Sequence, residues 1–316
     1  MTKQGAFGVD VGGTSIKIGL FASDGTLEEK WQIKTDTSEN GKHILPDIAS
    51  FLAKQMDERR LSPEEMEGVG IGVPGPVDER GLVRGCVNLG WGHVELVQEM
   101  EALCGMKVKA SNDANVAALG ELYAGSGKGY DSLVLATLGT GIGGGIVVNG
   151  KILQGAVGSG GEIGHITIHP KETRVCTCGK KGCLEQYASA TAMVHWAKHL
   201  LQKEDTPSVL RQGEVTAKTI LEAAKAGDAL ALRVVDIMTE ALGLGLANVA
   251  AVCDPQLILI GGGVSAAGAF LTDRITAHYK QYAFPATKET PIRTAALGND
   301  AGMVGAAFLL LGEVSR

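Results

Sequence analysis

The chain has 316 residues, of which 45% are hydrophobic, and a formal net charge of -6. An acidic chain without a cluster of lysine and arginine argues against nucleic-acid binding, because neutralising phosphates supplies most of that affinity. No apolar run approaches the length of a membrane span, and residues 1–10 lack the apolar core of a signal peptide. Because Cys86, Cys104 and Cys253 are isolated in sequence, we expect a reducing, cytoplasmic location. The length of the chain fits one large domain or two domains of ordinary size.

Residues 5–34 predict a meander of three strands, in which the apolar first strand contains Asp10 near its end. Gly12, Gly13 and Thr14 form the turn that follows. Two adjacent glycines let backbone N–H groups and the Thr14 hydroxyl point at an anion, and Asp10 is well placed to hold a cation beside it. An ordinary glycine hairpin explains the same pattern, so this turn alone does not decide its function.

The segment from residue 42 to residue 110 predicts strands and helices on both sides of one polar loop. We expect a helix over 42–60, a buried strand over 68–78, a strand over 82–91, a helix over about 93–104 and a short strand over 107–110. Asn88 and Trp91 lie on the loop that ends the strand at 82–91. Trp91 fits a stacking platform, a lid contact or a core position.

The sequence SNDAN at 111–115 precedes an apolar helix and holds a candidate for a general base. As an N-cap, Asp113 would serve the helix structurally. As a base, its carboxylate would be kept ionised by the positive end of the helix and could accept a proton from an alcohol. Position alone supports both explanations, and it puts Asn112 and Asp113 at the mouth of a cleft.

Residues 131–150 repeat the arrangement of strand, glycine turn and strand. The turn is Gly139-Thr140-Gly141, and Thr137 falls where Asp10 falls in the first copy. Two such units, roughly 125 residues apart, indicate two similar halves of the protein. Two hairpins that can grip phosphates predict a nucleotide between them.

Three cysteines at close spacing predict a metal site in the loop that follows. Cys176, Cys178 and Cys183 form the pattern C-x-C-G-x-x-G-C, and His165 and His169 lie just upstream. Zinc fits three thiolates and one imidazole best, and either histidine could be the fourth ligand. Three free thiols are the alternative, but the segment is too polar for a core. Four protein ligands leave no open position, so the site would be structural rather than catalytic.

The remaining chain predicts helices and one further glycine turn. Helices are expected over 186–203, 216–226, 228–252, from about 265, and over 300–311, with a last strand at Pro291. A buried strand runs into Gly261-Gly262-Gly263-Val264, a third place where the backbone can approach a ligand closely. That turn suits a flat base or a ribose.

Seven motifs together resemble the ROK family of bacterial sugar kinases and repressors, and most closely its glucokinases from Gram-positive bacteria. They are DVGGTSIK at 10–17, GVPGPVD at 72–78, SNDAN at 111–115, LGTGIGGG at 138–145, GEIGH at 161–165, CTCGKKGCLE at 176–185 and GGGV at 261–264. The cysteine motif and GEIGH are specific to the family, whereas single glycine turns are not.

The resemblance implies an α/β protein of the actin-like ATPase (ribonuclease H-like) fold, with two lobes of mixed sheets flanked by helices. A small lobe would comprise residues 1–113 and about 299–316. A large lobe would comprise 114–298 and contain a zinc loop at 165–185. The resemblance also implies ATP with Mg²⁺ in the cleft, in-line phosphorylation of glucose to glucose 6-phosphate, and usually a homodimer.

The family's functional residues map onto this chain position by position. Asp113 would be the base that takes the proton from the sugar hydroxyl. The groups that bind sugar hydroxyls would be Asn88, Asn112, Glu162, His165 and Glu185. The phosphate and magnesium loops would be Asp10, Gly12, Gly13, Thr14, Lys17, Thr137, Gly139, Thr140 and Gly141, and the adenosine side Gly262 and Gly263. The structural Zn²⁺ ligands would be His165, Cys176, Cys178 and Cys183. Ser111 departs from the glutamate that related glucokinases often carry.

Other functions stay open on the sequence. A family kinase could act on fructose, mannose, allose or an N-acetylhexosamine, because epimers differ by single hydrogen bonds. A polyphosphate could replace ATP as donor. A sugar-sensing regulator without catalysis would lack the base at position 113 or carry a DNA-binding arm, and neither is seen in the sequence.

Overall fold

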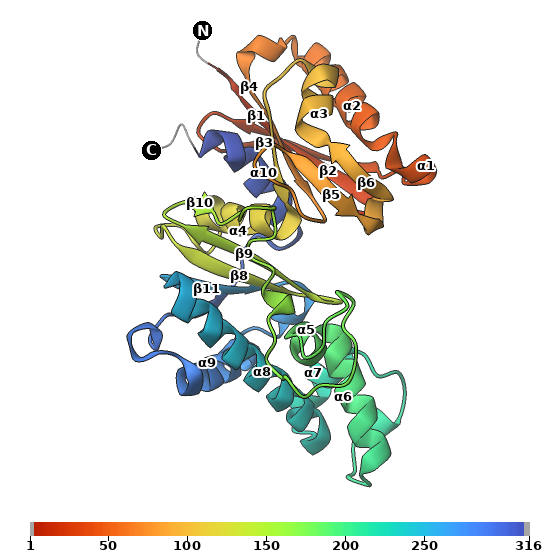
Figure 1. Cartoon of the computed structure of the whole chain (residues 1–316), viewed down its shortest axis with the longest axis vertical. Helices are drawn as coiled ribbons and strands as arrows, with labels where there is room; N and C mark the ends of the chain where they lie inside the picture. The colour runs from red at the N-terminus through yellow and green to blue at the C-terminus, as the bar shows by residue number, and fades with distance from the viewer. Residues whose placement is uncertain (1–2, 313–316) are drawn as a thin grey trace. The chain divides into compact units, whose positions relative to one another are not determined.

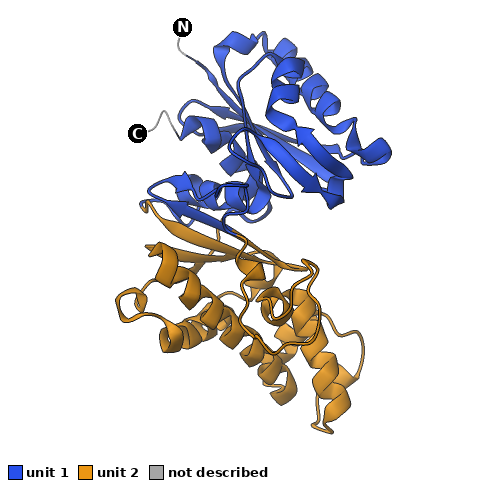
Figure 2. Cartoon of the chain, viewed as in Figure 1, with its two compact units in different colours: residues 1–129, 145–161, 297–316 blue, residues 130–144, 162–296 orange. Residues whose placement is uncertain are grey.

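The computed structural model describes residues 3–312, which fall into two compact units (Figure 2). Among the described residues, unit 1 comprises 3–129, 145–161 and 297–312, and unit 2 comprises 130–144 and 162–296. Within residues 3–312, no helix combines the length and hydropathy that a membrane span requires.

Unit 1 is built on a five-stranded sheet with the strand order β3-β2-β1-β4-β7. Its strands are β1 (Gly5–Val11), β2 (Ser15–Ala22), β3 (Leu27–Lys34), β4 (Met66–Val73) and β7 (Val108–Asn112). Strands β1 to β3 form the antiparallel meander that the sequence predicts, whereas β4 pairs in parallel with β1 and β7 in parallel with β4. The sheet is therefore mixed.

One face of this sheet carries the main hydrophobic core of unit 1. Alternate residues of β1, including Phe7 and Val9, are fully buried in the core cluster that also contains α2 and α3. The helices of this part are α1 (Ser38–Gly41), α2 (Ile44–Arg59) and α3 (Leu96–Cys104), which Figure 1 shows beside the sheet. The predicted apolar face of α2 is confirmed, because Ile44, Ile48 and Leu52 are buried.

The opposite face of the sheet packs against α10 (Ala301–Leu311), and α4 (Asp113–Ala124) packs on α10. Glycines on β1 and β4 allow this close approach. A Cβ atom at Gly8 would lie 2.2 Å from the Met303 carbonyl oxygen, and one at Gly70 would lie 1.7 Å from that of Ala306. All residues of α10 except Leu309 are buried, which agrees with a helix that is apolar all round.

A small two-stranded sheet follows β4, formed by β5 (Leu82–Cys86) and β6 (Trp91–Glu95). The predicted helix start near residue 93 was wrong, because residues 91–95 pair antiparallel with β5 and α3 begins at Leu96. Trp91 is a core residue rather than a stacking platform. Its side chain is buried, and its Nε1 donates a hydrogen bond to the Gly41 carbonyl oxygen at 3.1 Å.

A second five-stranded sheet has the order β10-β9-β8-β11-β12, and the boundary between the units falls within β9. Its strands are β8 (Leu133–Leu138), β9 (Ile142–Val148), β10 (Lys151–Ile152), β11 (Leu257–Gly261) and β12 (Ile292–Thr294). Strand β11 runs parallel to both β8 and β12. This sheet is also mixed, because β10 runs antiparallel to β9.

The α-helices of unit 2 pack closely on one another. They are α5 (Glu185–Ala188), α6 (Ala190–Lys203), α7 (Ala217–Lys225), α8 (Ala229–Cys253) and α9 (Ala269–Tyr282). The predicted close packing at two glycines of α8 is confirmed. A Cβ atom at Gly243 would lie 2.7 Å from the Tyr279 backbone nitrogen, and one at Gly245 would lie 2.6 Å from the Leu184 side chain.

Short 3₁₀ helices connect several elements. They are η1 (Pro63–Glu65), η2 (Val87–Leu89), η3 (Ile163–His165), η4 (Val209–Arg211), η5 (Gly263–Ala267), η6 (Pro285–Thr287) and η7 (Gly298–Asp300).

The compact units place residues 114–129 and 145–161 in unit 1, whereas the expected large lobe included them. As boundaries of moving lobes, residues 113 and 298 stay a prediction.

Candidate functional site

The first glycine turn follows a carboxylate at the end of β1. Asp10 is the next-to-last residue of β1 and pairs in register with Lys17, whose Nζ lies 3.8 Å from Asp10 Oδ2. A Cβ atom at Gly302 would lie 2.7 Å from Asp10 Cγ, so α10 begins against this carboxyl group. Burial raises the pKa of Asp10, and the nearby Lys17 charge lowers it in part. A divalent cation would favour the ionised form further.

The turn itself is held by backbone contacts and exposes its tip. The Gly12 N–H donates to the Ser15 carbonyl oxygen at 3.0 Å, and Thr35 Oγ1 donates to the Gly12 carbonyl oxygen at 2.6 Å. Gly13 and Thr14 are exposed. A Cβ atom at Gly13 would lie 3.3 Å from the Asn88 carbonyl oxygen, which places the predicted sugar-binding Asn88 beside this turn.

Asn112, and not Asp113, is the N-cap of α4. Its Oδ1 accepts hydrogen bonds from the backbone N–H groups of Ala114 at 2.9 Å and Asn115 at 3.3 Å, and its Nδ2 donates to the Gly75 carbonyl oxygen at 3.2 Å. An amide has two N–H donors, so this pattern leaves Asn112 one for a ligand.

Asp113 is the first residue of α4, and its Oδ1 accepts from the Ala114 N–H at 2.7 Å. The Asp113 side chain thus lies at the N-terminus of α4, where the helix dipole interacts favourably with anionic groups. The sequence did not point to Cys86, whose buried thiol is close enough for the Asp113 charge to contribute to raising the Cys86 pKa, after burial as the main cause. No sequence motif marks that cysteine.

The second glycine turn lies in unit 2, and other elements of that unit hold it. Thr137 is the next-to-last residue of β8, as Asp10 is of β1. The Gly139 N–H donates to the Gly141 carbonyl oxygen at 3.0 Å, and the Ala190 N–H at the start of α6 donates to the Gly139 carbonyl oxygen at 2.9 Å. A Cβ atom at Gly141 would lie 2.6 Å from Glu185 Oε2, so this carboxylate rests on the turn.

A cavity of about 480 Å³ opens beside the second turn, within unit 2. Gly139 and Thr140 line it together with η5 and α7. Its lining is mainly apolar, with Lys218, Glu222 and Lys225 supplied by α7, and its volume is in the range of small-molecule sites.

The third glycine turn forms one wall of this cavity. Gly262 has a φ of +78°, and a Cβ atom there would lie 2.4 Å from the Leu138 carbonyl oxygen, so only glycine fits. The predicted close approach of the backbone is therefore present at Gly262. The predicted helix start near residue 265 was wrong, because η5 and a left-handed Gly268 come before α9.

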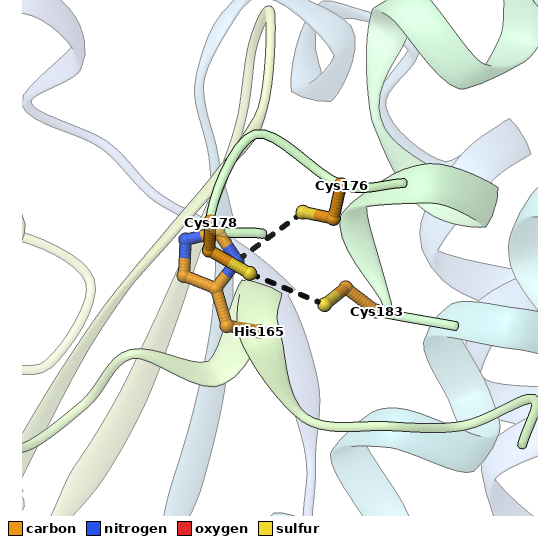
Figure 3. A group of neighbouring side chains, drawn as sticks. All are labelled: His165, Cys176, Cys178 and Cys183. Atoms are coloured by element: carbon orange, nitrogen blue, oxygen red, sulfur yellow. Dashed lines mark hydrogen bonds between the residues drawn. The ribbon is translucent and has the colours of Figure 1, made fainter. Parts of the chain in front are cut away.

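The three cysteines gather around His165, as Figure 3 shows. The four ligand atoms all lie within 4.8 Å of one another. Cys176 Sγ is 3.7 Å from His165 Nδ1, and Cys178 Sγ is 3.6 Å from Cys183 Sγ. Tetrahedral zinc, with bonds of about 2.3 Å to sulfur, holds its sulfur ligands roughly 3.8 Å apart, so this donor set fits zinc. His169 instead stacks on Tyr187 with ring centroids 5.5 Å apart.

The thiols of this cluster differ in their acidity. Burial raises the pKa of Cys183 to about 12 and also raises that of Cys176, whereas the Lys180 backbone N–H lowers that of Cys178. A metal ion binds thiolates, so loading the site must release protons. Metal affinity should therefore fall as the pH falls.

Two predicted sugar-binding residues, Glu185 and Glu162, adjoin the same cluster. Glu185 Oε1 accepts hydrogen bonds from Cys176 Sγ at 2.9 Å and Thr177 Oγ1 at 3.0 Å, and it lies 3.8 Å from His165 Nδ1. Glu162 precedes η3, and its carbonyl oxygen accepts from the His165 N–H at 3.1 Å. A metal on Nδ1 would leave the Nε2 atom of His165 for a substrate hydroxyl.

The predicted site residues thus form local groups within each unit. Unit 1 holds Asn88, Asn112 and Asp113 together with the first turn, and unit 2 holds Glu162, His165 and Glu185 together with the second and third turns. Each group contains residues far apart in sequence that the fold brings together.

Comparison with known proteins gives matches over nearly the whole chain. The sequence model of the ROK family matches residues 6–313. A glucokinase from Halalkalibacterium halodurans is 42% identical over 316 residues, which are 98% of this chain and 96% of that protein.

Two solved structures have similar folds. The ROK hexokinase from Thermus thermophilus has a TM-score of 0.83 and 32% identity, covering 98% of this chain and 99% of that one. A ROK family glucokinase from Streptomyces griseus, in complex with glucose and AMPPNP, has a TM-score of 0.75 and 35% identity, covering 96% and 98%. The expected actin-like ATPase fold is confirmed.

Proposed function

Because this chain belongs to the ROK family, we propose that it is an ATP-dependent hexose kinase that phosphorylates glucose to glucose 6-phosphate. The observation that carries the proposal is the cavity of about 480 Å³ in unit 2, which a phosphate-type glycine turn and the Gly262 turn both border. A nucleotide needs this combination of an apolar wall for its base and backbone N–H groups for its phosphates.

ATP would place its adenosine against Gly262 and Gly263 and its phosphates against Thr137, Gly139, Thr140 and Gly141. The first turn would supply the remaining contacts to phosphate and magnesium through Asp10, Gly12, Gly13, Thr14 and Lys17. When bound, Mg²⁺ neutralises charge on the transferred phosphoryl group. The Asp10 carboxylate suits it, because Mg²⁺ prefers carboxylate oxygens and water as ligands.

Asp113 would accept the proton of the sugar 6-hydroxyl while its oxygen attacks the γ-phosphorus in line and ADP leaves. A positioned base of this kind contributes about 10² to 10⁴ in rate. The hydroxyl groups of the sugar would be bound by Asn88, Asn112, Glu162, His165 and Glu185. Most of the remaining catalysis is positioning, since phosphoryl transfer needs little covalent help from the protein.

His165, Cys176, Cys178 and Cys183 would hold a structural Zn²⁺. The ion supplies a cross-link, and its four protein ligands leave no position for a reacting group. The chain's own residues then act through this cross-link, because Glu185 accepts a hydrogen bond from Thr177, between two of the ligands, and lies against the second glycine turn. The proposal also includes a cytoplasmic location and a homodimer, which the family resemblance implies.

The test is an initial-rate comparison with Mg-ATP across glucose, mannose, fructose, allose, N-acetylglucosamine and N-acetylmannosamine. We expect glucose to be strongly preferred. Preference for another sugar would keep the kinase mechanism and overturn the substrate. The panel is repeated with polyphosphate as the donor. No turnover of any sugar with either donor would overturn the proposed kinase activity and favour a sugar-sensing regulator.

A further inference from the structure

Unit 1 contains a separate cavity of about 650 Å³ that the proposed function does not use. Strand β7, helices α4 and α10, the β10 segment and the turn at residues 79–81 line it. β7 is the last strand of the sheet in unit 1 and pairs with a neighbour, β4, on one side. β7 is thus an edge strand, and its Val108 N–H donates a hydrogen bond to Glu101 Oε1 at 3.1 Å.

Ser111 lines this cavity and has an unused hydroxyl group. The residue is 2% exposed, and its Oγ has no hydrogen-bond partner within residues 3–312. A buried hydroxyl without a partner is costly and calls for a ligand or water that satisfies it. Successive side chains of a strand point to opposite faces, so the side chains of Ser111 and Asn112 lie on opposite faces of the sheet.

The other walls combine apolar surface with positive charge. Tyr123 and Phe308 stack with ring centroids 4.6 Å apart and planes 2° apart, and both line the cavity. Arg80, Lys109 and Lys151 also line it together with Glu79, and Arg80 Nη2 lies 3.8 Å from Asp78 Oδ2 outside the lining. No ion pair of the described residues involves Lys151. An excess of cations around an apolar wall and a buried hydroxyl suits a phosphorylated small molecule.

We propose that this cavity is a binding site for a phosphorylated sugar or a similar small polyanion, and that its occupant regulates the enzyme. Regulation rests on the proposed function, because Ser111 directly precedes the N-cap Asn112 and the proposed base Asp113. A ligand that hydrogen-bonds Ser111 fixes the end of β7 and the first turn of α4. It thereby changes the alignment of Asp113 and hence the turnover rate.

Binding is tested by calorimetry with fructose 1,6-bisphosphate as the probe and neutral fructose as its matched control. Glucose and a non-hydrolysable ATP analogue are present at saturation, with free Mg²⁺ held constant, so that the proposed catalytic site is filled. The variants are Ser111→Ala and Lys151→Ala, with Lys54→Ala on the exposed side of α2 as the control. Ser111→Ala should also raise the melting temperature, because it removes a buried hydroxyl that has no partner.

We expect one-to-one binding of the bisphosphate to the wild type and to Lys54→Ala. In Ser111→Ala and Lys151→Ala the dissociation constant should be about tenfold higher. Fructose should not bind. No binding to the wild type, or equal binding by all four proteins, would overturn the site.

A second readout separates the site from its regulatory role and from the proposed function. The bisphosphate should change kcat in the wild type, and Lys151→Ala should need about tenfold more bisphosphate for the same change. Binding without any change in kcat would overturn the regulatory part. Calorimetry on Asp113→Asn, which should bind the probe without turnover, tests the site even if the chain is not a kinase.

Discussion

The two glycine turns share one local design and differ in what surrounds them. Both follow a buried strand whose next-to-last residue is polar, Asp10 in β1 and Thr137 in β8. The first turn adjoins a charged pair, Asp10 and Lys17, at the start of α10. The second adjoins an apolar cavity, Gly262 and the carboxylate of Glu185.

This difference shows that a repeated backbone unit acquires its role from the elements packed beyond it. A strand, glycine turn and strand supply N–H groups for phosphate in both places. The first has a carboxylate, Asp10, as the next-to-last residue of its strand, where the second has Thr137, and the second borders a cavity of nucleoside size. We therefore assign magnesium to the first turn and the nucleoside to the second.

The strongest way to break this assignment is to compare Asp10→Asn with Thr137→Ala, the change at the matching position. We expect Asp10→Asn to lower kcat by about 10² to 10³, because it removes the carboxylate that would hold Mg²⁺ beside the transferred phosphoryl group. Thr137→Ala should cost about tenfold or less, the effect of one neutral hydrogen bond. Steady-state rates at several Mg²⁺ concentrations measure both, and equal losses would contradict the division of roles.

Asp10→Asn should lower activity but raise the stability of the protein at neutral pH. Burial raises the pKa of Asp10, so the folded state disfavours the ionised carboxyl. Its contribution to stability is complete below the unfolded pKa and is lost as the pH rises through the raised folded pKa. In the absence of Mg²⁺, Asp10→Asn should therefore melt at a higher temperature than the wild type at pH 7, and this gain should disappear in acid. A lower melting temperature at pH 7 would show that the Lys17 pair outweighs burial.

Gly262→Ala tests the packing that makes the second turn different, with Gly263→Ala as its neighbouring control. A Cβ atom at Gly262 would clash with the Leu138 backbone, and the positive φ of Gly262 is unfavourable for alanine. A Cβ atom at Gly263 would have no neighbour within 4 Å. We expect Gly262→Ala to destabilise the protein by roughly 2–4 kcal/mol and Gly263→Ala by about 0.5 kcal/mol or less. Chemical denaturation measures both, and similar values would refute the close approach.

Cys178→Ser tests whether the metal cluster supports the second turn through Glu185. We expect loss of bound zinc and a fall in kcat/KM of about tenfold, because the loop would no longer position Glu185. The measurements are zinc content by elemental analysis and kinetics with glucose and ATP, with Cys253→Ser as the control outside the cluster. A zinc-free variant with full activity would disprove the supporting role.

The sequence predicted those parts of the fold that depend on local pattern. The meander of β1 to β3 follows from alternation and glycine turns, and the apolar face of α2 follows from helical spacing. Strand β6 was missed because its short sequence forms a strand only by pairing with β5. The late start of α9 depends on the glycines at 262 and 268, which fit more than one local conformation.

The candidate site was predictable in its residues and less so in their contacts. Cysteine spacing predicted the metal cluster but left His165 and His169 open, and the family resemblance favoured His165. The structure places His165 with the cysteines and stacks His169 on Tyr187. Asn112 and Asp113 are both good capping residues, so the choice depends on where β7 ends. The contact of Glu185 with the second turn joins residues over 40 positions apart, and no local pattern encodes it.

The most direct test of the account measures glucose binding and turnover together in Asp113→Asn. Because Asn112 is the cap of α4, the account predicts an intact fold, glucose affinity close to that of the wild type, and a kcat lower by about 10² to 10⁴. Undiminished turnover, or the joint loss of glucose binding and folding, would contradict the role of Asp113 as the base.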